Sequence, residues 1–299
     1  MNHPHGCCVW DSHVLVADAY NHRLIIVQDA VHQQRQRQHA PPPPDLSPRS
    51  SLSARRAAIS RAVTTHRHQQ DLAPNSSSVL TTVAPAWKYP HDVAVSDEGL
   101  VFVSDFDGNS VWSNTWEGVS QGQEWRAVDP GLRLNHPCGL SWSSASARLA
   151  IADCYNNRVG ILRPHTAAAA AGDAGDAHAH AADAGAATST STIWSTCHLS
   201  HPTGVCWSRD SSSLAVADFD SGRVVWLHGD TLQAQAEVAL GRAQACSCRL
   251  YDVECVGGDA GRDVWVATDC ITSHVYVVQR DARVRSGVAL AAAADMMTS

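Results

Sequence analysis

Five aspartates recur along this chain in one local setting, where each ends a short apolar run and begins a turn. Carboxylates gathered from several repeats could hold a metal ion or act as general acid and base. One carboxylate per repeat, always at the same turn, is explained more simply by architecture. Asp oxygens bond backbone N–H groups two residues on, and Asp tolerates left-handed backbone. We therefore interpret the five as structural: Asp18, Asp105, Asp153, Asp218 and Asp269.

Arginines follow three of these aspartates at a fixed spacing of five residues. They are Arg23, Arg158 and Arg223, whereas the second copy has Ser110 in this place. A guanidinium group so close to a carboxylate can form a charge-assisted pair with it. We expect three such pairs, one in each of the three turns.

A proline motif precedes the aspartates. It reads HPHG at His3–Gly6, YPHD at Tyr89–Asp92, HPCG at His136–Gly139 and HPTG at His201–Gly204, and it is reduced to LYD at Leu250–Asp252. Proline cannot donate to a sheet, so the motif marks the connection before a strand. We call these segments the His-Pro lead-ins.

Cysteine and histidine clusters suggest zinc at two places. Cys246, Cys248 and Cys255 form one cluster, and Cys197-His198 with His201 forms the other. Neither has the paired CxxC spacing of a structural zinc site. The chain has ten cysteines and no secretory signal at Met1–Trp10, which favours reduced thiols. We expect no metal and no cofactor.

Short strands must carry these residues. In the fourth copy the apolar runs are 204–207, 214–217 and 224–227, each too short for a helix and bounded by Gly, Pro, Asp and Ser. A more polar fourth strand is predicted after each triplet, at 79–83, 124–128, 192–196 and 235–240. The two shorter intervals between repeat aspartates are close to the length of one four-stranded propeller blade, about 40–50 residues.

The repeated pattern, Pro-x-Gly followed by an apolar run and then by [Ala/Ser]-Asp-x-x-Asn-x-Arg, resembles the NHL repeat. The matching segments are about 1–27, 79–112, 135–162, 200–227 and, weakly, 250–278. The resemblance implies an all-β propeller, for which six blades are usual, and five are visible here. A truncated sequence, a five-bladed ring and a sixth blade built from Gln279–Ser299 all remain open.

We expect a single propeller domain over 1–299. The predicted blades are about 1–84, 85–130, 131–198, 199–243 and 244–285, with disordered inserts at about 29–78 and 163–191 and a flexible tail at about 286–299. Gly6, Asp92, Gly139 and Gly204 are expected near the axis, where close approach leaves little room for a side chain.

The net charge of the chain indicates which class of macromolecule it is expected to bind. The net charge is −7, although 31–71 is rich in arginine. Binding to nucleic acid needs a basic face, so we expect a protein or peptide partner, with RNA possible only through the basic insert. No apolar run is long enough to cross a membrane, so we expect a cytoplasmic protein.

An enzyme is the alternative to a scaffold without catalytic residues. The sequence also resembles propeller lyases and lactonases, in which histidines or acids from several blades meet a metal on the axis. His5 and His91 occupy matching positions, but the equivalents in the other blades are Cys138, Thr203 and Tyr251.

Both inserts are predicted to leave from the face opposite the lead-ins and the Asp turns. We therefore expect the partner to bind the face with the lead-ins, called the His-Pro face below.

Overall fold

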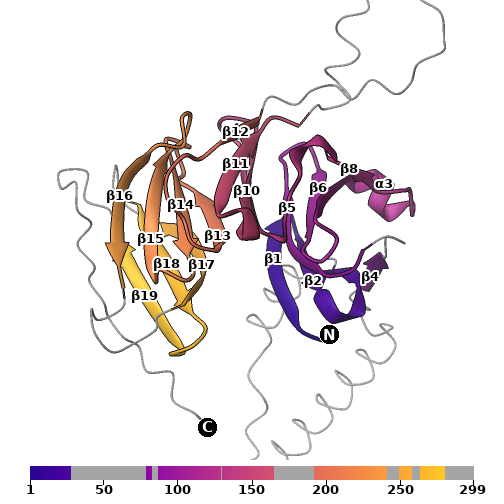
Figure 1. Cartoon of the computed structure of the whole chain (residues 1–299). Coiled ribbons are helices and arrows are strands. Elements are labelled where there is room, and N and C mark those ends of the chain that lie inside the picture. Colours follow the sequence, from indigo (N-terminus) through magenta and orange to yellow (C-terminus); the bar gives the residue numbers. More distant parts are fainter. Residues whose placement is uncertain are drawn as a thin grey trace, which may run out of the picture. The chain divides into compact units, whose positions relative to one another are not determined.

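The computed structural model describes residues 1–27, 79–82, 87–128, 130–164, 192–240, 249–257 and 263–279 (Figure 1). The first sheet contains β1 (Pro4–Trp10), β2 (His13–Asp18), β3 (Arg23–Val27) and β4 (Val79–Thr82). The second contains β5 (Pro90–Val95), β6 (Leu100–Asp105), β7 (Ser110–Thr115) and β8 (Arg126–Ala127). The third contains β9 (Pro137–Ser143), β10 (Arg148–Asp153), β11 (Arg158–Leu162) and β12 (Thr192–Trp194).

The fourth sheet contains β13 (Pro202–Trp207), β14 (Ser213–Asp218), β15 (Arg223–His228) and β16 (Ala234–Ala239). The fifth contains β17 (Leu250–Gly257), β18 (Val264–Asp269) and β19 (His274–Gln279). Helical structure in the described residues is limited to α3 (Trp116–Ser120) and the single 3-10 turns η1 (Ala19–Asn21), η2 (Pro130–Leu132) and η3 (Cys154–Asn156). The prediction of an all-β propeller is confirmed.

The fourth strands lie where the sequence predicted them. In four sheets the outermost strand is β4, β8, β12 or β16, and each falls within or beside its predicted range. The third-to-fourth-strand connections after Val27 and Leu162 contain the two low-complexity inserts, as predicted from their positions in the sequence. The inserts themselves, and the tail after Gln279, lie outside the described residues.

The chain divides into two compact units. One comprises Met1–Cys8, Val16–Leu24 and Thr82–Ser299, and the other comprises Val9–Leu15 and Ile25–Thr81. In the second unit, Trp10 and His13 face each other across the hairpin with ring centroids 6.3 Å apart. The candidate site described below belongs wholly to the first unit.

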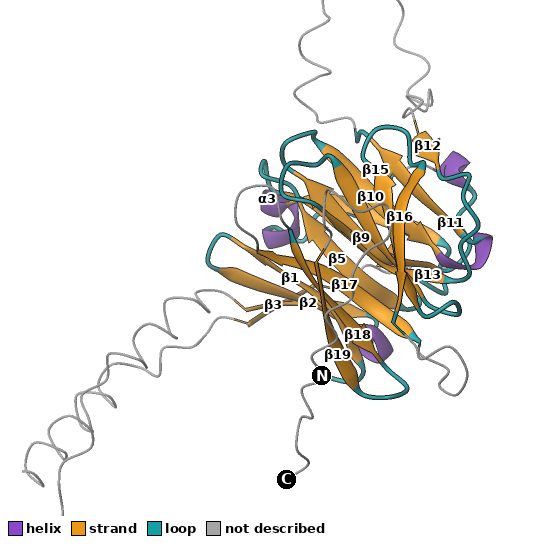
Figure 2. Ribbon diagram, turned by 90° about the vertical axis from the view of Figure 1, so that its left-hand side faces the viewer, coloured by secondary structure: helices purple, strands orange, loops and turns teal. Residues whose placement is uncertain are grey.

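Within the first unit, the inner strands pack in sequence order, β5 against β9, β9 against β13 and β13 against β17 (Figure 2). The core lies between successive sheets. Trp226 of the fourth sheet meets Trp265 of the fifth edge-on, with ring centroids 6.4 Å apart, and both are fully buried. All six residues of β14 are buried, because apolar side chains cover both faces of that sheet.

Trp142 and Trp207 occupy equivalent positions, three residues after Gly139 and Gly204. Trp207 is buried, and its Nε1 donates to the Ser141 carbonyl of the preceding sheet at 3.1 Å. Trp142 is partly buried and stacks on Phe102 of its own preceding sheet, with centroids 5.8 Å apart. Both tryptophans therefore pack against the preceding sheet, and Trp142 is the less completely covered of the two.

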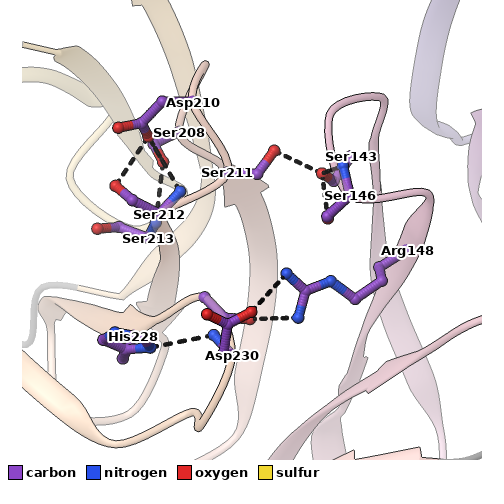
Figure 3. A network of polar contacts seen from close by, with 11 residues as sticks. Ser143, Ser146, Arg148, Ser208, Asp210, Ser211, Ser212, Ser213, His228 and Asp230 are labelled. Atoms are coloured by element: carbon purple, nitrogen blue, oxygen red, sulfur yellow. Dashed lines mark hydrogen bonds and ion pairs between the residues drawn. The ribbon is translucent and has the colours of Figure 1, made fainter.

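Polar turns join the third and fourth sheets at the end away from the lead-ins (Figure 3). Arg148 donates to the Gly229 carbonyl at 3.0 Å and to Asp230 at 2.8 Å, and its guanidinium lies 5.5 Å from the Trp207 ring. Ser143 bonds Ser211 at 2.5 Å across the same boundary. These bonds fix two neighbouring blades to each other.

Among the described residues, no helix is both long and apolar enough to span a bilayer.

Candidate binding site

The repeat aspartates tie the end of each second strand to the lead-in of the same blade. Asp18 accepts the backbone N–H of Asn2 at 2.5 Å, and Asp153 accepts that of Asn135 at 2.7 Å. Asp218 bonds Ser200 in the same way at 2.5 Å. In the second and fifth blades the partners are Lys88 and Tyr89 for Asp105, and Arg249 for Asp269. Each carboxylate thus holds the backbone that enters the inner strand.

This geometry corrects one expectation. Each Asp was expected to bond N–H groups within its own turn, but Asp18 and Asp153 make no such bond. Among the described bonds only Asp269 does so, accepting from Ile271 at 2.9 Å and from Thr272 at 3.2 Å. A lead-in segment lies beside every one of the five turns, and its backbone N–H groups are well-placed donors to the Asp carboxylate.

The arginine pairs form at the predicted spacing. Arg23, Arg158 and Arg223 each place Nε 2.7 Å from the second carboxylate oxygen of their aspartate. The carboxylates of Asp18, Asp153 and Asp218 are fully buried. Burial alone would raise the pKa of Asp18, but bonds from Asn2, Asn21 and Arg23 outweigh it and lower that pKa below its usual value.

The turns also connect each blade to the next. The fourth residue after each Asp has left-handed backbone, as His22, Asn109, Asn157, Gly222 and Ser273. Asn109 and Asn157 use this position to accept the N–H of His136 at 2.8 Å and of His201 at 2.9 Å. The histidine before the lead-in proline is therefore held by the preceding blade.

The four residues expected near the axis each lie against the next blade. A Cβ added to Gly139 would lie 2.5 Å from the Thr203 carbonyl oxygen, and one added to Gly204 would lie 2.7 Å from the Asp252 Cα. Gly6 is similarly crowded by Asp92, whose carboxylate accepts the Leu140 N–H at 2.7 Å. Burial, and then the nearby Asp252, raise the pKa of Asp92 well above its usual range.

A pocket of about 550 Å³ opens beside this axis on the His-Pro face, and all five blades contribute to its lining. The residues that follow the lead-in prolines, or stand in that position, are His5, His91, Cys138, Thr203 and Tyr251. Residues one or two after the repeat Asp line the pocket as well: Tyr20, Phe106, Asp107, Cys154, Tyr155, Phe219 and Asp220. Tyr89, His201 and Arg249 complete the lining.

Two histidines and two tyrosines form a hydrogen-bonded cluster in the pocket. The rings of His5 and His91 stack with centroids 4.6 Å apart, and both bond the Tyr251 hydroxyl, His91 through Nε2 at 2.7 Å. The other ring nitrogen of His5 lies 2.6 Å from the Tyr89 hydroxyl. His91 Nδ1 is buried without a partner.

Burial controls the protonation of this cluster. Desolvation, and then the neighbouring His5, lower the pKa of His91 to about 3, and burial also lowers the pKa of His5. Burial raises the pKa of both Tyr89 and Tyr251. At neutral pH the four groups therefore form an uncharged network.

The other candidate metal ligands are not assembled into a site. No group of three or more His, Cys, Asp or Glu side chains in the described part of the chain is arranged to hold a metal ion. His201, from one of the two clusters that the sequence analysis considered for zinc, bonds Asp220. Cys255, from the other, uses its backbone N–H to bond Cys206 Sγ at 3.3 Å, while Cys246 and Cys248 lie outside the described residues.

The pocket's aromatic residues were missed in the sequence. Four of the five copies carry an aromatic ring one or two residues after the Asp: Tyr20, Phe106, Tyr155 and Phe219. The regular position of these aromatic residues is visible in the sequence. The sequence does not indicate that their side chains point toward a shared axis. Tyr89 and Tyr251 gave no repeat signal, because each replaces the usual residue of its lead-in.

Comparisons with known proteins support the fold. A streptogramin B lyase structure matches with a TM-score of 0.55 and 9% identity, covering 94% of this chain and 69% of that one. A chain of a nidogen/laminin complex also matches with a TM-score of 0.55, at 14% identity, covering 95% of this chain and 78% of that one. The chain is a β-propeller.

No protein-family model and no curated protein matches the sequence. The resemblance to NHL repeats therefore stays a prediction.

Proposed function

We propose that this chain is a propeller of the NHL type that binds a protein or peptide partner in the axial pocket, without catalysing a reaction. The observation that carries the proposal is the pocket on the His-Pro face, lined from all five blades. An apolar pocket with a few convergent polar groups is the usual form of a binding site. One structural neighbour comes from a nidogen/laminin protein complex, which is consistent with a protein partner.

The rim of the pocket suits a polypeptide. Tyr20 and Tyr155 are 51% and 48% exposed, so both residues are accessible to an incoming ligand. Tyrosine supplies a large contact area at little conformational cost, and it is enriched among residues that dominate binding energy. A cytoplasmic location belongs to the same proposal.

Panning a random-peptide display library on the full chain tests this function. We expect enriched peptides to bind the wild type and to lose about tenfold or more in affinity for Tyr155→Ala. Ile193→Ala is the matched control, because Ile193 is 43% exposed on the outer strand β12. Failure to enrich any peptide, or equal binding to the wild type and Tyr155→Ala, would overturn the proposal.

The metal-dependent enzyme remains the second candidate, since His5 and His91 do meet in the pocket. Both ring nitrogens of His5 are engaged by tyrosines, however, and the matching positions in the third and fourth blades hold Cys138 and Thr203. Calorimetric titration with Zn²⁺ and Ca²⁺ separates the two functions. Stoichiometric binding that is lost in His91→Phe would favour the enzyme.

The third candidate, RNA binding through 31–71, concerns residues outside the described part.

A further inference from the structure

The pocket has one uncompensated charge among its described residues, and it is negative. The charged side chains that line it are Asp107, Asp220 and Arg249. Arg249 bonds Asp220 and lies 5.2 Å above the Phe219 ring, so those two charges neutralise each other. Among the described residues Asp107 is paired with a histidine, with His136 Nε2 at 3.9 Å, and its side chain is 53% exposed. The local field therefore favours a positive ligand.

Two of the three histidines in the pocket lining add no charge to this balance. His5 and His91 are neutral at pH 7, because burial lowers the pKa of both rings, and the third, His201, bonds Asp220 through Nδ1. An anionic ligand would need a free cation in the pocket, and the described lining offers only Arg249, which Asp220 already binds. Phosphate and carboxylate ligands are therefore disfavoured.

Aromatic rings stand next to the free carboxylate. Phe106, the residue before Asp107, meets Tyr155 edge-on at 5.8 Å and Tyr89 at 5.9 Å between ring centroids. Tyr20 extends the row, with its centroid 5.4 Å from that of Tyr89. A cation within about 6 Å of an aromatic face is attracted by the negative face of the ring, and the attraction strengthens when water is displaced.

We propose that the axial pocket recognises a cation, namely the ammonium or guanidinium group of a Lys or Arg side chain or a small quaternary ammonium compound. The aromatic row of Tyr20, Tyr89, Phe106 and Tyr155 encloses the apolar shell of the cation, and Asp107 supplies the opposing charge. This inference rests on the proposed binding function and names the ligand chemistry for the same pocket.

A matched pair of probes tests the charge requirement on the full chain. Tetramethylammonium chloride and neopentyl alcohol have similar size, but only the first is charged. We expect tetramethylammonium to bind at least threefold more tightly by NMR titration, with resonance shifts at Phe106 and Tyr155. Equal binding, or tighter binding of the alcohol, would overturn the proposal.

Variants locate the site. Asp107→Asn keeps the size of an exposed side chain, so the protein should fold, and we expect tetramethylammonium affinity to fall about threefold to tenfold. Asp97→Asn is the control, because Asp97 is an exposed acid that accepts from Ser144 in a turn at the opposite end of the strands. An equal effect of the two substitutions would contradict a role for Asp107.

Binding of library peptides distinguishes a Lys or Arg side chain from a small quaternary ammonium compound as the ligand. It also distinguishes failure of the cation inference from failure of the peptide-binding function. Library peptides enriched in Lys or Arg, with binding reduced in Asp107→Asn, would identify a polypeptide cation. Peptides that depend on Tyr155 but carry no Lys or Arg would overturn the cation inference and leave the peptide-binding function standing. Tetramethylammonium binding without any peptide enrichment would overturn the peptide-binding function and leave the cation inference standing. It would indicate a small quaternary ammonium ligand.

Discussion

At the scale of single residues, one carboxylate in each blade accepts several hydrogen bonds at once. Asp218 accepts the Ser200 N–H and the Arg223 Nε within a fully buried setting, and Asp18 and Asp153 repeat the arrangement. A buried acceptor that loses its partners costs more free energy than an exposed pair contributes. The repeated Asp is thus explained by how a lead-in is attached to its blade.

Replacing Asp218 with alanine should lower the free energy of unfolding by about 2 kcal/mol or more, because the Ser200 N–H and Arg223 lose their acceptor. Urea unfolding followed by tryptophan fluorescence measures the change. Asp230→Ala is the control. Asp230 is 70% exposed and bonds Arg148, so its loss should cost under about 1 kcal/mol. Equal costs for the two variants would contradict the structural role of the repeat Asp.

The buried His91 should make stability depend on pH. Its pKa falls from 6.5 in the unfolded chain to about 3 in the fold, so the unfolded chain binds the proton more readily between these values. Its contribution is therefore complete above pH 6.5 and is lost as the pH falls, by about 2 kcal/mol at pH 5.

His91→Phe isolates this contribution from that of Asp92, whose raised pKa acts in the opposite direction. We expect the unfolding free energy of His91→Phe to fall less than that of the wild type between pH 8 and pH 5, as measured by chemical denaturation. Parallel pH profiles for the two proteins would show that His91 is not buried as a neutral ring.

At the scale of the elements, the sequence predicted the strands well because turn residues bound every apolar run. The hairpins, the outer strands and the two insertion points were all recoverable from periodicity and from Gly, Pro and Asp positions. The bonding of each Asp to a lead-in some 16 to 20 residues earlier was not recoverable. Local turn chemistry predicts local partners, and a competing long-range donor appears only when the strand is folded.

The fifth sheet differs from the others in burial. β17 and β18 combine buried residues with partly or fully exposed ones, whereas β14 is buried throughout. In β19, Val278 is fully buried against the fourth sheet, while the adjacent Val277 is 38% exposed. Sequence alone did not show this asymmetry, since both residues belong to one apolar run.

The two valines therefore form a matched pair. Val278→Ala should cost about 2 kcal/mol of unfolding free energy, because it leaves a cavity in a packed core. Val277→Ala should cost under about 1 kcal/mol. Thermal or urea unfolding of both variants tests the expectation, and a larger cost for Val277 would place the core on the other face of the sheet.

At the scale of the molecule, residues from five weakly similar repeats line one pocket. Four blades contribute to the pocket from the same two positions, directly after the lead-in proline and just after the repeat Asp, and the fifth contributes Arg249 and Tyr251 from its lead-in. The sequence did not predict the pocket, because a repeat pattern specifies the blade and leaves open which side chains meet at the axis, and the binding face stays a prediction. What distinguishes the blades there, from His5 to Tyr251, is what would give the pocket its specificity.

Hydrogen exchange with and without a library-selected peptide shows whether the peptide occupies the axial pocket, because it reports on the backbone of every blade at once. We expect slowed exchange at Tyr20, Tyr89–Asp92, Phe106–Asp107 and Cys154–Tyr155, with no change in the opposite turns at Ser143–Ser146 and Ser208–Ser213. Protection confined to those opposite turns, with the His-Pro face unchanged, would contradict this expectation.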